Sequence, residues 1–157
     1  MTYRKDGTDR APATLIDGQP RHAHSVGWLD DIHAFDVAVP SVQRLLKLMP
    51  LIWRCRALQT RGIEPCPLCL KEGRPDPERL VSFASPERGV TVLGSAELWI
   101  PAPSGDVWVG PDLLVHYVAE HGYAPPNEFW IAVDAFNGSR AWDAELVAQG
   151  FLGRSSS

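Results

Sequence analysis

The chain has 157 residues, of which 45% are hydrophobic and 22% charged, and its formal net charge at pH 7 is −4. These values are typical of one soluble globular domain, and they argue against binding to nucleic acids through bulk positive charge. The sequence contains no run of about 18 apolar residues, which predicts no membrane span. It has three cysteines and no apolar N-terminal stretch, so we expect neither a disulfide framework nor secretion, and a cytoplasmic location.

The domain organisation follows from changes in composition along the chain. Residues 1–20 are polar and interrupted by glycine and proline, which predicts a disordered N-terminal tail. Residues 153–157, rich in serine, predict a frayed C-terminus. Neither a repeat nor a linker interrupts residues 21–152, which we expect to form a single globular domain.

In the segment before Ser41, the apolar residues follow no clear helical or strand period. We therefore expect turns and extended structure there. This serine precedes a helical pattern at residues 42–49, where it is a favourable N-cap, and Pro50 limits the helix at its other end. Residues 51–58, LIWRCRAL, alternate in character and predict a strand. Residues 73–88 are loop-rich, with room for one short element.

A β-hairpin is predicted in the middle of the chain. Residues 90–93 and 97–100 carry β-forming side chains, residues 104–106 (SGD) supply a turn, and residues 107–109 return. The hairpin predicts a small antiparallel sheet.

Three helices are predicted after this hairpin, at residues 112–121, 127–136 and 140–149. Gly122 follows the first helix as a left-handed stop, two prolines open the second, and Ser139 is placed to cap the third. Together the elements predict an α+β fold with a small antiparallel sheet, a loop resembling a zinc knuckle and three to four helices.

That knuckle-like loop is the segment EPCPLCLKEG, in which Cys66 and Cys69 have the spacing C-x-x-C. Structural zinc takes four thiolate or imidazole ligands in a tetrahedron, and a C-x-x-C turn can supply two of them. His116 and His121 can supply the other two from the first predicted helix. The sequence therefore predicts a structural zinc site made by these four residues.

The spacing of the two histidines sets a geometric condition on this site. Five residues rotate by about 500°, so a straight helix would point the imidazoles of His116 and His121 about 140° apart. Both can reach one metal only if the helix tightens or unwinds near Gly122. Without metal, His121 would act as a C-terminal cap that interacts with the helix dipole, and His116 would be a partly buried polar residue.

Alternatives for the cysteines remain open. Cys55 could replace one histidine as a ligand, although it shares the predicted strand face with Leu51 and Trp53, which favours a buried structural thiol. Redox chemistry requires C-x-x-C at the start of a helix. Gly73 and Pro75 end any helix there within a turn, which disfavours it.

The order of knuckle, hairpin and helix resembles a treble-clef zinc finger over residues 51–122. The resemblance implies that Cys66 and Cys69 form the first ligand pair. His116 and His121 match the second pair imperfectly, because that pair lies near the start of the helix in the family. The segment GSAELWIPAPSGDVWVGPDLLVHYVAEHGYAPPNEF also resembles a group of small bacterial proteins of unknown function, which implies no activity.

The first functional hypothesis is a non-enzymatic, zinc-stabilised domain that acts through contacts with an unknown protein partner, as an adaptor, immunity or antitoxin-like protein. The sequence contains no G-x-S-x-G, phosphate-binding glycine loop or H-E-x-x-H motif, which favours a protein without enzymatic activity. Tryptophans are candidate partner anchors, although core packing is the expected use of most of them. The candidates are Trp99, Trp108, Trp130 and Trp142.

Two alternatives use other residues. Residues 41–74 hold seven basic against two acidic side chains, and a nucleic-acid-binding protein would use this segment on phosphates. Its candidate contacts are Arg54, Arg56, Arg61, Lys71 and Arg74. A metal-dependent hydrolase would instead use His22, His24 and His33, with a carboxylate from Asp30, Asp31 or Asp36.

Overall fold

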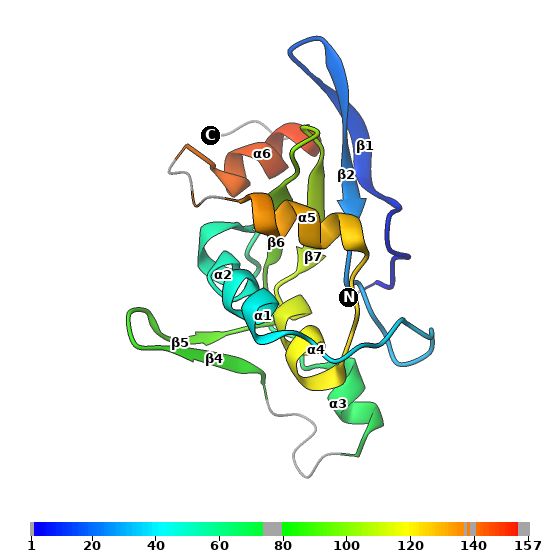
Figure 1. The fold of residues 1–157 in the computed structure, drawn as a ribbon, viewed down its shortest axis with the longest axis vertical. Coiled ribbons are helices and arrows are strands. Elements are labelled where there is room, and N and C mark those ends of the chain that lie inside the picture. Colours follow the sequence, from blue (N-terminus) through cyan, green and yellow to red (C-terminus); the bar gives the residue numbers. More distant parts are fainter. Residues whose placement is uncertain (1, 74–79, 137, 139–140, 154–157) are drawn as a thin grey trace.

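The computed structural model describes residues 2–73, 80–136, 138 and 141–153. Its main feature is a five-stranded sheet with helices on both faces (Figure 1). The strands lie in the order β1 (Asp9–Ile16), β2 (Gln19–Ser25), β7 (Val107–Pro111), β6 (Glu97–Pro101) and β3 (Arg56–Ala57). β2 and β7 run parallel and the other neighbours antiparallel, so the predicted α+β class is confirmed, with a mixed sheet.

Alternation along the central strands creates two cores. Leu98 and Ile100 of β6 face a core shared with α1 (Val42–Leu48), α2 (Leu51–Arg54), α4 (Leu114–His121) and α5 (Asn127–Ala135). Trp99, between them, faces the opposite core with α6 (Ala144–Phe151). Successive strand residues point to opposite sides, so β6 is buried on both faces.

The predicted helices are present, with one change of cap. Ser41 caps α1 by accepting a 3.1 Å hydrogen bond from the Arg44 amide, and Gly122 ends α4 with φ +67°. The last helix begins later than predicted, because the Asp143 carboxylate caps it by accepting from the Leu146 amide at 3.0 Å. Ser139, the predicted cap, lies outside the described residues.

The strand predicted at residues 51–58 is largely wrong. Leu51 and Ile52 are both buried, which a strand with one exposed face does not allow, and residues 51–54 form the helix α2 after Pro50. Trp53 is half-buried and Arg54 exposed, and burial alternates only after this helix, from Cys55 to Leu58. Only residues 56–57 pair as a strand, β3, with β6.

The disordered tail predicted at residues 1–20 is also wrong. Residues 9–16 form β1, which pairs with β2 through a turn at Asp17 and Gly18, with φ of 53° and 76°. Two consecutive positive φ values are typical of the type I′ turn that Asp-Gly favours in hairpins. Arg10 also donates two hydrogen bonds, of 3.0 and 2.7 Å, to the Glu97 carboxylate.

The predicted hairpin is present as β6 and β7, but residues 90–93 do not join it. Residues 90–92 belong instead to β5 (Gly89–Val92), which pairs with β4 (Ser82–Ser85) in a separate two-stranded sheet that projects from the body (Figure 1). Leu93 is buried in the core. Residues 154–157 of the predicted frayed end lie outside the described residues. Among the described residues, no helix combines the length and apolar character needed to cross a membrane.

Candidate metal centre

The two cysteines and two histidines singled out in the sequence meet where α3 (Pro67–Lys71) approaches the end of α4. Their four ligand atoms all lie within 4.8 Å of one another. Among the described residues, no other group of three or more metal-ligating side chains lies that close together. The structure therefore contains a Cys2His2 group that is near enough to hold a metal ion.

The cysteines are placed by the start of α3. Cys66 is the N-cap of this short helix, and its Sγ accepts a hydrogen bond from the Cys69 amide at 3.4 Å. Pro67 occupies the first helical turn, where its missing N–H is not needed. α3 ends at Lys71, so the segment is one short turn that brings both thiols to the same side.

The histidines converge despite their spacing of five residues. His121 is the last residue of α4, and its ring lies 4.9 Å from that of His116, with an angle of 77° between the ring planes. Each ring points its Nε2 atom, the one farthest from the backbone, toward the other, and these two atoms are 3.2 Å apart. The Cys69 Sγ is 3.3 Å from each Nε2 atom, and the Cys66 Sγ is 3.4 Å from that of His121.

Glu72 is a fifth member of the site that sequence reasoning missed. Its Oε1 lies 2.9 Å from the Nδ1 of His121. An Nδ1–H that donates to a carboxylate leaves Nε2 as the unprotonated, ligand-forming nitrogen. An acidic residue three positions after the second cysteine is a signal that could have indicated this role.

Three of the four ligand side chains are shielded from solvent, and Cys69 is partly exposed. The Cys66 residue is fully buried, His116 is 8% exposed, and the His121 side chain is 1% exposed. Burial raises the pKa of the Cys66 thiol to about 12, although the hydrogen bond from the Cys69 amide lowers it. A bound cation reverses this preference, because a coordinating thiol is deprotonated. Four protein atoms in a shielded cluster match a closed metal site rather than one with open positions.

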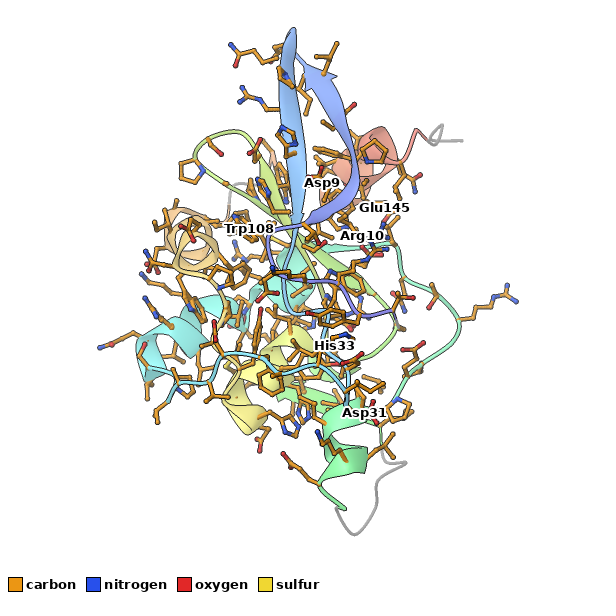
Figure 2. All side chains as sticks on the ribbon, turned by 90° about the vertical axis from the view of Figure 1, so that its right-hand side faces the viewer. Asp9, Arg10, Asp31, His33, Trp108 and Glu145 are labelled. Atoms are coloured by element: carbon orange, nitrogen blue, oxygen red, sulfur yellow. The ribbon has the colours of Figure 1, made fainter. Side chains whose placement is uncertain are left out.

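The remaining cysteine and histidines lie elsewhere. Cys55 is fully buried in the apolar core and is not part of the group. His22 and His24 are on β2, and the carboxylate beside His24 is that of Asp106. His33 lies in a loop near α3, where it pairs with Asp30 at 2.9 Å and stacks on Tyr3, so it does not join the other two (Figure 2).

Three of the proposed nucleic-acid contacts, Arg54, Arg56 and Lys71, each make a separate intramolecular contact. Arg56 pairs with the buried Asp112 at 3.2 Å, and Arg54 donates to the Gly138 carbonyl at 3.1 Å. Lys71 donates to the Asp31 carbonyl at 2.9 Å. Arg61 is exposed in the loop after β3, and Arg74 lies outside the described residues.

Comparison with known proteins gives one assignment. No curated protein and no solved structure matches this chain. One family model matches residues 2–134, a span that includes the sheet and all four residues of the Cys2His2 group. The chain therefore belongs to the family described as "Domain of unknown function (DUF7919)".

Proposed function

We propose that this protein is a domain stabilised by one structural zinc ion held by Cys66, Cys69, His116 and His121. The observation that supports it is the distances within the group. Zinc bonds of about 2.3 Å to sulfur and about 2.05 Å to nitrogen give tetrahedral edges of about 3.6 Å (S to N) and about 3.3 Å (N to N). Three S-to-N distances in the group are 3.3–3.4 Å, and the N-to-N distance is 3.2 Å.

Zinc suits this group better than other common metals do. Two thiols and two imidazoles are soft to intermediate ligands, whereas calcium and magnesium prefer oxygen. The ligands come from the start of α3 and from the helix that follows the β6–β7 hairpin. This order supports a treble-clef-like arrangement, with the second ligand pair displaced toward the end of its helix.

The metal would fix a segment that has little other anchoring. Within α3, Leu68 is the residue buried in the core, whereas Leu70 and Lys71 are exposed. α4, in contrast, has a buried run at residues 114–118. Zinc would join the weakly packed segment to the well-packed helix, so its binding free energy contributes to folding.

Elemental analysis of the purified protein tests this proposal. We expect one zinc per chain in the parent and none in Cys69→Ser or His116→Ala, each with lower thermal stability. Cys55→Ser, which removes a buried thiol outside the group, should keep its zinc. One zinc per chain in His116→Ala would show that this histidine is not a ligand. A parent protein without bound metal would refute the proposal.

We also propose that the domain has no enzymatic activity and acts through contacts with a protein partner. Three exposed aliphatic residues in α1 and just before it support the partner contact: Val39 is 96% exposed, Val42 70% and Leu46 62%. Val42 and Leu46 are four apart and share the outer side of the helix. Trp99, Trp108 and Trp130, in contrast, are buried, so core packing accounts for these three predicted anchors.

The partner role can be tested by comparing the parent with a Val42→Asp/Leu46→Asp double variant. Partners from the source cells should be captured by the parent and lost in the variant, while zinc content and thermal midpoint stay unchanged. Capture of the same proteins by both would contradict the assignment of this surface. Binding to DNA or RNA that falls steeply with salt and is weakened by Arg54→Glu would favour the nucleic-acid alternative instead.

A further inference from the structure

Two His–Asp pairs, His22 with Asp9 and His24 with Asp106, lie at the β1–β2 hairpin, at the other end of the molecule from α3 (Figure 1). Their ligand atoms are farther apart than those of the Cys2His2 group. His22 and His24 are two residues apart on β2, so their side chains share one face of the strand. Their rings are 6.0 Å apart and nearly parallel, with an angle of 25°. Cross-strand pairing brings Asp9 of β1 opposite His24, on the same face.

Asp106 completes the cluster from the turn between β6 and β7. Its Oδ2 lies 2.9 Å from the Nε2 of His24, and its Oδ1 accepts a 3.0 Å hydrogen bond from the His22 amide. Arg21 donates to the Ser104 carbonyl at 2.6 Å and so holds this turn against β2. The carboxylate is therefore positioned by backbone contacts that do not depend on the His24 ring.

The separation of His24 and Asp106 matches that of two ligands of one metal. Bonds of about 2.1 Å at a right angle place two neighbouring ligand atoms about 3.0 Å apart. The His24 ring is also packed against Trp108, at 5.1 Å between ring centroids, which limits its rotation. The hydrogen-bonded nitrogen of His24 and oxygen of Asp106 are thus already at the separation of two adjacent ligands.

His22 and Asp9 are the adjustable members. Their side chains are 44% and 56% exposed, and the His22 Nδ1 lies 3.7 Å from the Asp9 Oδ1. Metal binding requires the His22 ring to turn toward His24, and a half-exposed ring can do so between staggered rotamers. Such a site has two imidazoles, one or two carboxylates and water in the remaining positions.

We propose that His22, His24 and Asp106, with Asp9 as a fourth ligand, bind a divalent transition-metal ion in an open, exchangeable site. Imidazole and carboxylate ligands suit ions such as Ni²⁺, Co²⁺ and Zn²⁺. Solvent exposure distinguishes this site from the closed Cys2His2 group. The ion would join β1, β2 and the β6–β7 turn, three segments far apart in the sequence.

The test is a calorimetric titration of the zinc-loaded full chain with Ni²⁺, accompanied by NMR spectra that locate paramagnetic broadening. We expect one Ni²⁺ per chain beyond the zinc, with broadening centred on residues 22–24 and 106. His24→Gln should weaken Ni²⁺ binding at least tenfold, because its amide can still donate to Asp106 but replaces the imidazole ligand. Asp106→Asn should also weaken it.

The matched control is His33→Gln, which removes a histidine that pairs with Asp30 outside the cluster. This variant should bind Ni²⁺ as the parent does. Absence of Ni²⁺ binding in the folded parent, or equal affinity in His24→Gln, would overturn the proposal and leave the cluster as hydrogen bonds that fix the hairpin. Cys69→Ser should retain this site if it stays folded, so the outcome is independent of the structural zinc.

Discussion

The metal corner, residues 66–73 with His116 and His121, differs from the sheet core of β6, β7 and α6 in what holds it together. In the sheet core, Trp99, Val109 and Phe151 are buried by packing alone. The metal corner has one short helix, in which Leu68 is buried, and it gathers two thiols and two imidazoles with S-to-N and N-to-N contacts of 3.2–3.4 Å. The proposed zinc would therefore stabilise this corner, whereas apolar burial stabilises the sheet core.

Removal of a metal ligand should have the largest effect. Cys69→Ser should abolish zinc binding and lower the free energy of unfolding on the order of 5 kcal/mol, which chemical denaturation measures. This loss is smaller than the zinc-binding free energy of zinc-finger peptides, about 10–16 kcal/mol, because a packed core remains after the metal is lost. Hydrogen exchange should rise first in residues 66–73. A change below about 1 kcal/mol would mean that packing alone holds the corner.

The sheet core should respond to volume instead of metal. Trp99→Ala removes a fully buried indole and should lower the free energy of unfolding by about 3–5 kcal/mol. The variant's zinc content should remain one per chain, because Trp99 is outside the Cys2His2 group. Zinc loss in the folded variant would show that the two regions are not independent.

Acid should weaken the metal corner more than the sheet core. Burial raises the pKa of the metal-free Cys66 thiol to about 12, so zinc must displace a proton from it at every pH below that value. Apparent zinc affinity should therefore rise with pH, and protonation of Cys66 should lower it by up to tenfold per pH unit on acidification. Competition with a chelator between pH 6 and pH 8 measures this slope. An affinity independent of pH would argue against thiolate ligands.

Glu72→Gln should have the smallest effect. The amide keeps the side-chain size but loses the charge that orients His121. Zinc affinity should therefore fall about tenfold, the lower end of the typical effect of removing a group that hydrogen-bonds a metal ligand. Glu120→Gln is the control, because Glu120 is exposed on α4 and precedes His121 in the sequence. Equal losses in both variants would indicate a general charge effect rather than orientation of the imidazole.

Local signals in the sequence were sufficient for much of the fold. Ser41 before a helical pattern and Gly122 after one predicted α1 and α4, because caps are decided by nearby residues. Residues 51–54 were misread because tertiary packing buries Leu51 and Ile52 together, which an alternating pattern does not reveal. The Asp17-Gly18 turn was a readable hairpin signal within a segment whose polar composition suggested disorder.

The candidate site was predictable in its residues and not in its geometry. Spacing alone suggested that His116 and His121 point about 140° apart. Their convergence depends on side-chain rotamers and on the approach of α3 from another part of the chain, which are tertiary facts. The same holds for Asp106, which reaches His24 across 82 residues of sequence.

The most direct test of the account is X-ray absorption at the zinc edge of the purified protein. We predict a first shell of two sulfur atoms at about 2.3 Å and two nitrogen atoms at about 2.0 Å, with no oxygen. His116→Ala and Cys69→Ser should show no zinc-edge signal at the same protein concentration, because each lacks one of the four ligands. Zinc bound by oxygen atoms, or by imidazoles without sulfur, would contradict a structural Cys2His2 centre.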